Sequence, residues 1–180
     1  PARKTVSRIL GALFDDLIDD RHRERLTVAE GRVKNQNRLW LKLHRDKYWN
    51  QVQELDDIVK VIDDIVGTRV IALTISDVTT ALDAIRSLPE FNHDSDDNTK
   101  PLYRVSDTER DYIVDVKPSG YRAQHINIVV NVQHHSQFVP IECEVQIRTL
   151  LQDSWGELTH EDSYKQGTPM PELISSMSRL

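Results

Sequence analysis

Three apolar segments of the chain are rich in β-branched residues and have the length of β-strands. They read GTRVIALTI at 67–75, HINIVVNV at 125–132 and VPIECEVQI at 139–147, and a shorter fourth candidate is YIVDV at 112–116. Runs of this kind favour buried strands, which must pair in a common sheet. Helical patterns occur between and around them, and no internal repeat is found. The sequence therefore predicts one α/β domain with a central mixed sheet and helices packed against it.

Helical periodicity predicts four helices around that sheet. Their extents, with inward residues in parentheses, are 3 to about 24; Asn35 to Tyr48 (Leu39, Trp40 and Leu43); the segment after an N-cap at Ser76 and Asp77 (Val78, Ala81, Leu82, Ile85 and Leu88); and about Thr149 to Tyr164. LTVAEGRVK, at 26–34, alternates briefly like a strand, and the polar segment 92–101 is predicted to be a loop.

Composition limits the classes of protein to which the chain can belong. With 180 residues, 38% hydrophobic and 29% charged, it has the size and composition of one soluble domain. Its formal net charge of −6 argues against a general nucleic-acid binder, because such proteins present a basic face to phosphate. Its apolar runs are too short for a membrane span, and PARKTVSRIL lacks the features of a signal peptide. The single Cys143 is predicted to be a buried, inert thiol, and we expect a cytoplasmic protein.

Two pairs of carboxylates lie where a sheet could bring them together. Asp63 and Asp64 precede the first predicted strand, and Glu142 and Glu144 lie two residues apart in the last one, so these glutamates share a face. Two carboxylates on one face of a central strand are costly unless a positive charge neutralises them. Mg²⁺ held by one or two carboxylates and by substrate phosphates would do so. The alternative is that the aspartates are solvated and the glutamates pair with Arg148 or a lysine.

Cationic residues occur near the same strand ends. They are Arg32, Lys34, Lys42, Arg69, Arg110 and Lys117. In an acidic protein such a set is suited to hold a polyphosphate locally rather than to coat a duplex. Each of these residues taken singly is more typical of a solvated surface charge. Their combination with the carboxylates is what favours a phosphate site.

Four segments then carry a resemblance to a known family. They are GRVKNQNRLWLKL, DDIVGTRVI, ERDYIVDVKPSGYRAQH and ECEVQIRTLLQDSWGELTHEDSYK, in this order. Together they resemble the alarmone synthetase domain of the RelA/SpoT family, a branch of the nucleotidyltransferase superfold, over roughly residues 30 to 165. DIVGTR alone is a weak signal, whereas K-x-x-G-Y-R-x-x-H followed by E-V-Q-I-R-T and then by W-x-x-x-x-H-x-x-x-Y-K is specific. The resemblance implies a single synthetase domain over 1–180, with a nucleotidyltransferase-like mixed sheet and a short C-terminal segment at 166–180.

The resemblance also implies an activity. This is transfer of the β,γ-pyrophosphoryl group of ATP to the 3′-hydroxyl of GTP, GDP or GMP, giving pppGpp, ppGpp or pGpp in the stringent response. By motif position, Asp64 and Glu144 resemble the family's Mg²⁺ ligands. Glu144 is also the candidate base for the attacking hydroxyl.

The nucleotide contacts follow from the same resemblance. They are Arg32 and Arg69 around adenine, Lys34 and Lys42 near the ATP phosphates, Arg110 and Lys117 on a loop that closes over the reacting phosphates, Tyr121 stacked on guanine, and His125 at the acceptor's ribose or phosphates. Planar guanidinium groups suit the first task. Without the family, Tyr121 and His125 would be interpreted as packing residues. His160 matches a family histidine, with support of the acceptor pocket and a structural role both open.

Two residues depart from the family pattern. Arg38 and Ala123 stand where the family usually has Ser, which leaves substrate preference and rate open. The sequence has no His-Asp hydrolase motif, so a small, synthesis-only member is expected, and such proteins are homo-oligomers, often tetramers. Two other functions stay open: a related transferase acting on an adenosine nucleotide or the tRNA 3′ end, and a non-catalytic nucleotide-binding module.

Overall fold

The computed structural model describes most of the chain. The described residues are 1–19, 24–54, 57–58, 61–88, 103–118, 120–134 and 137–157. No helix within these ranges is long and apolar enough to cross a membrane. Four features predicted from the sequence lie outside them: the loop at 92–101, His160, the far end of the last helix and the segment 166–180.

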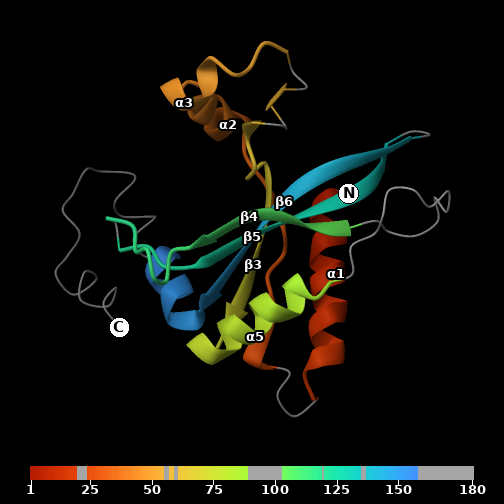
Figure 1. Cartoon of the computed structure of the whole chain (residues 1–180), viewed down its shortest axis with the longest axis vertical. Coiled ribbons are helices and arrows are strands. Elements are labelled where there is room, and N and C mark those ends of the chain that lie inside the picture. The colour runs from red at the N-terminus through yellow and green to blue at the C-terminus, as the bar shows by residue number, and fades with distance from the viewer. Residues whose placement is uncertain are drawn as a thin grey trace.

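A mixed sheet of six strands forms the centre of the described fold (Figure 1). The strands are β1 (Leu26–Val28), β2 (Arg32–Val33), β3 (Val66–Ala72), β4 (Tyr103–Asp111), β5 (Gln124–His134) and β6 (Gln137–Thr149). Their order is β1-β3-β6-β5-β4, and β2 also pairs with β3. β3 and β6 run parallel, and the other pairs are antiparallel. The three long apolar runs and the α/β fold with a mixed sheet are therefore confirmed.

Helices α1 (Ala2–Leu17) and α5 (Ile75–Arg86) cover one face of this sheet. Figure 1 shows the two helices together on one side of the strands. Their apolar residues repeat at helical spacing, so Leu10, Phe14, Leu82 and Ile85 are buried against the strands. Because side chains alternate between the faces of a strand, the central strands give one face to this core and leave the other to polar residues.

The N-terminus of α5 differs from the prediction. Its N-cap is Thr74, whose Oγ1 accepts from the Asp77 backbone N–H at 3.2 Å, while Asp77 Oδ2 accepts from the Thr74 N–H at 3.0 Å. The predicted cap at Ser76 and Asp77 was wrong, because this reciprocal capping box satisfies the free N–H groups with Thr74 as the N-cap, two residues before Ser76. Arg25 also donates to Asp77, with Nη2 2.6 Å from Oδ1. The five predicted inward residues of α5 and its C-terminal flank are buried.

The first helix is shorter than predicted. α1 ends at Leu17 instead of near residue 24, and Ile18 has an extended backbone (φ −112°, ψ 123°). The last turn contains Asp15 and Asp16 and no basic residue. Acidic side chains are unfavourable near the negative end of the helix dipole. The partly buried Ile18 also packs against the core in its extended conformation.

The predicted helix at 35–48 is divided into α2 (Gln36–Leu43) and α3 (Asp46–Trp49). The division occurs because Arg45 has an extended backbone (φ −75°, ψ 138°). Leu43 is buried as predicted, but Trp40 is 59% exposed. The indole of Trp40 contacts the rings of His44 and Trp49 instead of the core, with centroid distances of 4.1 and 6.4 Å. In Figure 1, α2 and α3 stand apart from α1 and α5.

The prediction that YIVDV forms a strand was wrong. Residues 112–114 form a turn, and the strand β4 lies just before them. Asp111 Oδ1 accepts hydrogen bonds from the backbone N–H groups of Ile113 and Val114, both at 2.9 Å. A short polar side chain that bonds to the backbone two and three residues on favours a turn over a strand. Val114 is accordingly 75% exposed. After β6, the last predicted helix is present over residues 150–157.

Candidate active site

The polar face of the sheet brings together side chains from four strands. Glu144 and Gln146 of β6 share this face, because the residues between and beside them are buried in the core. On one side, β3 places Arg69 beside Gln146. On the other side, β5 places His125 beside Gln146, and β4 places Arg110 beside His125. The sheet register therefore assembles residues that are far apart in the sequence.

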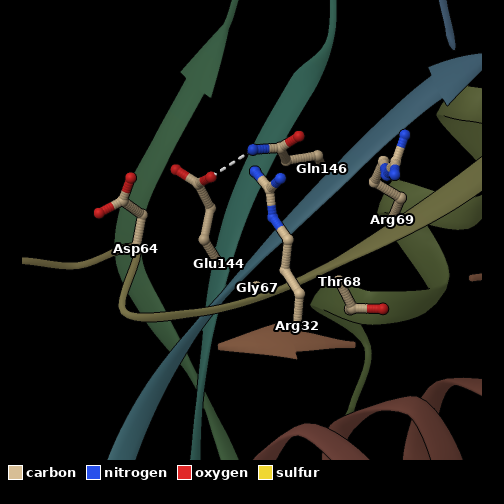
Figure 2. Close-up of a pocket in the computed structure, with 7 residues that line it drawn as sticks. All are labelled: Arg32, Asp64, Gly67, Thr68, Arg69, Glu144 and Gln146. Atoms are coloured by element: carbon tan, nitrogen blue, oxygen red, sulfur yellow. Dashed lines mark hydrogen bonds between the residues drawn. The ribbon is translucent and has the colours of Figure 1, made fainter. Parts of the chain in front are cut away.

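A pocket opens on this face where β2, β3 and β6 meet (Figure 2). Its lining residues are Arg32, Asp64, Gly67, Thr68, Arg69, Glu144 and Gln146. Asp64 comes from the segment that leads into β3, and Figure 2 shows it on the same side of the pocket as Glu144. Four residues that the sequence predicted for the site thus line one pocket: Arg32, Asp64, Arg69 and Glu144.

Asp64 is held by the two lysines predicted for the ATP phosphates. Lys42 Nζ donates to Asp64 Oδ1 at 2.9 Å, and Lys34 Nζ donates to Oδ2. Burial by itself would raise the pKa of Asp64, but the two ammonium groups outweigh it and hold that pKa below its usual range. For Lys42, burial acts to lower the pKa, and the bond to Asp64 outweighs it, so the pKa is raised. Asp64 and Lys42 are therefore both charged at neutral pH.

Glu144 is more deeply buried than Asp64, with side-chain exposures of 9% and 25%. Its Oε2 lies 3.1 Å from His125 Nδ1, and its Oε1 accepts from Gln146 Nε2 at 2.5 Å. Burial favours the neutral acid, but the contacts with His125 and Gln146 outweigh it and lower the pKa of Glu144 to about 2. Glu144 is therefore an anion at neutral pH.

Asp64 and Glu144 form an oxygen-donor pair that fits Mg²⁺. Within the part of the chain that the structure describes, no cluster of three or more His, Cys, Asp or Glu side chains could hold a metal ion. Mg²⁺ is nevertheless commonly held by one or two carboxylates, completed by waters and substrate phosphates. A carboxylate oxygen that accepts one hydrogen bond keeps a second lone pair for a metal. The pair therefore suits an ion that arrives with a phosphate-bearing substrate.

The predicted acceptor-side residues are connected to Glu144. Tyr121 Oη lies 2.8 Å from His125 Nε2, and the other ring nitrogen of His125 faces Glu144. Burial raises the pKa of Tyr121 to about 12, so its hydroxyl keeps its proton. Lys117 Nζ lies over two rings, 3.9 Å from the centroid of Tyr112 and 4.7 Å from that of Tyr121. The structure thus brings Lys117, Tyr121 and His125 together.

Two predicted nucleotide-binding arginines take part in ion pairs. Arg110 Nη2 lies 3.0 Å from Asp63 Oδ2, and Lys42, which bonds to Asp64, also lies 3.6 Å from Asp63 Oδ1. Arg69 Nη1 donates to Asp153 Oδ1 at 2.9 Å and also contacts Glu157. Both guanidinium groups are thus held by carboxylates.

Sequence reasoning missed three neighbours of the site. Gln146 bonds to Glu144, Tyr112 packs on Lys117, and Asp153 pairs with Arg69. The two-residue spacing from Glu144 could have indicated Gln146. Tyr112 was not predicted at the site because it was assigned to a strand. Asp153 was not predicted because its contact with Arg69 depends on how the helix at 150–157 packs against β3.

Other candidate residues lie outside the pocket. Glu142 accepts from Asn127 Nδ2 at 3.0 Å, not from Arg148 or a lysine, so the alternative pairing proposed for it is wrong. Ala123 is 0% exposed, so this departure from the family occurs at a position where a small side chain packs in the interior, whereas Arg38 is exposed. Cys143 is also 0% exposed, and burial raises the pKa of its thiol to about 12, which confirms the predicted burial.

Comparisons of the sequence with known proteins identify one family. The sequence matches the model described as the region found in RelA / SpoT proteins over residues 31–169. Two similar curated proteins of Bacillus subtilis (strain 168) are GTP pyrophosphokinase YwaC, 29% identical over 114 residues, and GTP pyrophosphokinase YjbM, 28% identical over 116 residues. These alignments cover 63% and 64% of this chain but 48% and 49% of the relatives. The chain thus spans about half the length of the curated relatives it matches.

Solved structures share the fold. The small alarmone synthetase 1 of Bacillus subtilis bound to its product pppGpp has a TM-score of 0.75 at 24% identity, covering 99% of this chain and 82% of that chain. A GTP pyrophosphokinase family protein from Streptococcus pneumoniae has a TM-score of 0.71 at 25% identity, covering 96% of this chain and 81% of that chain. These likenesses agree with the mixed sheet flanked by helices.

Proposed function

This chain belongs to the RelA/SpoT family, and from that premise we propose that it is a pyrophosphokinase that makes alarmones. It transfers the β,γ-pyrophosphoryl group of ATP to the 3′-hydroxyl of GTP, GDP or GMP and releases AMP. The names of the two curated relatives support this activity. The observation that carries the proposal is the pair of carboxylates, Asp64 and Glu144, facing one pocket beside Lys34 and Lys42.

The donor side follows from the contacts of Asp64. Lys34 and Lys42 bond to a carboxylate whose oxygens resemble those of phosphate, so the phosphates of ATP can take over these bonds. Asp64 and Glu144 would hold Mg²⁺, which would supply positive charge to neutralise the charge that develops on the phosphates. Arg32 and Arg69 line the same pocket and offer planar groups to adenine.

The acceptor side uses Tyr121, His125 and Glu144. Guanine stacks on the ring of Tyr121 once Lys117 moves from it to the phosphates, and His125 holds the ribose near Glu144. The 3′-oxygen attacks the β-phosphorus of ATP while the bond to the AMP oxygen breaks, and Glu144 accepts the hydroxyl proton. A carboxylate with a pKa of about 2 is a weak base, so Glu144 acts chiefly by orienting the hydroxyl in a loose transition state.

Cofactor, partners and location belong to the same proposal. The cofactor is Mg²⁺, the partners are ATP and a guanosine nucleotide, and Arg110 moves from Asp63 to the reacting phosphates. The chain forms a homo-oligomer, such as a tetramer, and acts in the cytoplasm. Nucleic acid and membranes are not among its proposed partners.

A labelled-phosphate assay tests the activity. The protein is incubated with γ-labelled ATP, Mg²⁺ and, in separate reactions, GMP, GDP, GTP, no further acceptor, or deacylated tRNA. We expect label on at least one guanosine nucleotide and none on tRNA. Label on tRNA alone, or on ATP alone, would replace the proposal with the related transferase. No transfer to any acceptor, by protein that binds ATP, would favour a non-catalytic binding module.

A further inference from the structure

Arg148 of β6 is a buried cation that the proposed mechanism does not use. It is on the same face of the strand as Glu144 and Gln146, and its side chain is 7% exposed. Burial is the main reason that its pKa lies below the usual range. A buried guanidinium is costly unless it is paired and hydrogen-bonded. The contacts that hold Arg148 in place therefore matter.

One carboxylate oxygen joins Arg148 to the donor side of the pocket. Arg148 Nε lies 3.0 Å from Asp153 Oδ1, at an angle that makes this an ion pair without a well-aligned hydrogen bond. The same oxygen accepts from Arg69 Nη1 at 2.9 Å. Asp153, whose side chain is 14% exposed, thus bridges guanidinium groups from β6 and β3. If either guanidinium group moves away, the other no longer shares the Asp153 carboxylate.

Arg148 also contacts the acceptor side. Its Cζ lies 5.9 Å from the ring centroid of Tyr121, the residue proposed to stack on guanine. At this distance a guanidinium is attracted to the ring face. Tyr121 is in turn bonded to His125, which faces Glu144. Arg148 is therefore between the two groups of residues proposed to bind the nucleotides.

A glycine provides the space that Arg148 occupies. A Cβ built on Gly156 would lie 2.7 Å from Arg148 Nη1, closer than real Cβ contacts. Gly156 is in the helix at 150–157, which also carries Asp153 one turn earlier. Any other residue at this position would displace the guanidinium, so the helix both pairs with Arg148 and leaves room for it.

We propose that Arg148 is a positioning residue that couples the two nucleotide sites, through Asp153 to Arg69 and through the ring of Tyr121 to the acceptor. When ATP draws Arg69 from Asp153, Arg148 gains the whole of that carboxylate and the geometry beneath Tyr121 changes. Binding of one nucleotide therefore alters the affinity for the other. This inference rests on the proposed function, since it takes Arg69 and Tyr121 to contact ATP and the guanosine nucleotide.

Binding measurements on the full chain test the coupling without catalysis. The dissociation constant of a non-hydrolysable ATP analogue is measured by calorimetry with Mg²⁺, in the absence and presence of saturating GDP. In the wild type we expect the two constants to differ at least about 5-fold, a typical coupling between linked sites. In Arg148→Met the ratio should fall to near one. An unchanged ratio in that variant, or a ratio of one in a wild type that binds both nucleotides, overturns the inference.

A second variant avoids removing the buried charge. Gly156→Ala should displace the Arg148 guanidinium and reduce the ratio, although alanine favours the helix. Gly11→Ala in α1 is the matched control, because nothing beyond its chain neighbours and its own helix backbone lies within 4 Å of the added Cβ, and it should keep the wild-type ratio. Equal ratios in the two alanine variants contradict the proposal. Failure of the wild type to bind either nucleotide would instead remove the proposed function itself.

Discussion

Replacement of Glu144 by glutamine removes the negative charge of the side chain and keeps its size and shape. The carboxylate accepts from Gln146 Nε2 at 2.5 Å and faces His125 Nδ1 at 3.1 Å, so an amide of the same size loses the charge and turns an NH₂ group toward one of these two nitrogens. The pKa of Glu144 is about 2, against an ordinary value of 4.5. At about 1.4 kcal/mol per pKa unit, this difference corresponds to about 3 kcal/mol of folding stability carried by the charge.

The sign of this contribution fixes its pH dependence. A carboxyl group with a lowered pKa stabilises the folded state above its unfolded pKa of about 4.5, and the stabilisation is lost as pH falls toward about 2. Glu144→Gln should therefore reduce the free energy of unfolding by about 3 kcal/mol at pH 7, and by about half as much at pH 3. Domains commonly have about 5–15 kcal/mol of stability, so the variant should remain folded at pH 7.

Urea denaturation followed by circular dichroism measures this change. Glu142→Gln is the matched control, because Glu142 is in the same strand on the same face but bonds to Asn127 outside the pocket. We expect the control to lose about 1 kcal/mol or less and to keep transferase activity, whereas Glu144→Gln should lose transfer altogether. Unfolding free energy at pH 7 that is unchanged or increased in Glu144→Gln would refute the electrostatic reasoning. Retained turnover would remove Glu144 from the mechanism.

Three further predictions concern other parts of the molecule. Thr74→Ala removes the N-cap of α5 and should lower the free energy of unfolding by about 1 kcal/mol in urea titrations, without loss of activity; an unchanged midpoint would contradict the role of the capping box. Cys143, with 0% exposure and a pKa raised to about 12, should resist an aromatic disulfide reagent at pH 8 until the chain is unfolded, and rapid reaction of folded protein would show that the core is open. Tyr121→Ala should weaken GDP binding by about 5- to 150-fold, the value of one stacked base, with little change for an ATP analogue measured alone; equal losses for both would contradict the assignment.

The parts of the fold that the sequence predicts correctly have simple periodicities. β5 and β6 contain long apolar runs, and Glu142 and Glu144 share a face because strand side chains alternate. Asp64 and Glu144 then meet in one pocket through the parallel pairing of β3 with β6. Local patterns do not predict which strands pair, and the family resemblance implied only that Asp64 and Glu144 act together.

The errors occur where a local polar contact outweighs an apolar pattern. YIVDV has the composition of a strand, but the Asp111 carboxylate binds two backbone N–H groups and produces a turn. Trp40 has the spacing of an inward residue, yet it packs on His44 and Trp49 at the surface. Long-range ion pairs, such as the one between Arg69 and Asp153, have no signature in a single sequence.

The fate of the ATP phosphates distinguishes pyrophosphoryl transfer from transfer of a single phosphate. The protein is given Mg²⁺ and ATP labelled either at the α- or at the γ-phosphate, with GTP or 3′-deoxy-GTP as acceptor, and the products are identified by chromatography and mass. We expect γ-label to move to GTP with the mass of a diphosphate, α-label to appear in AMP, and 3′-deoxy-GTP to accept nothing. Release of ADP with transfer of a single phosphate, or modification of 3′-deoxy-GTP, would contradict it.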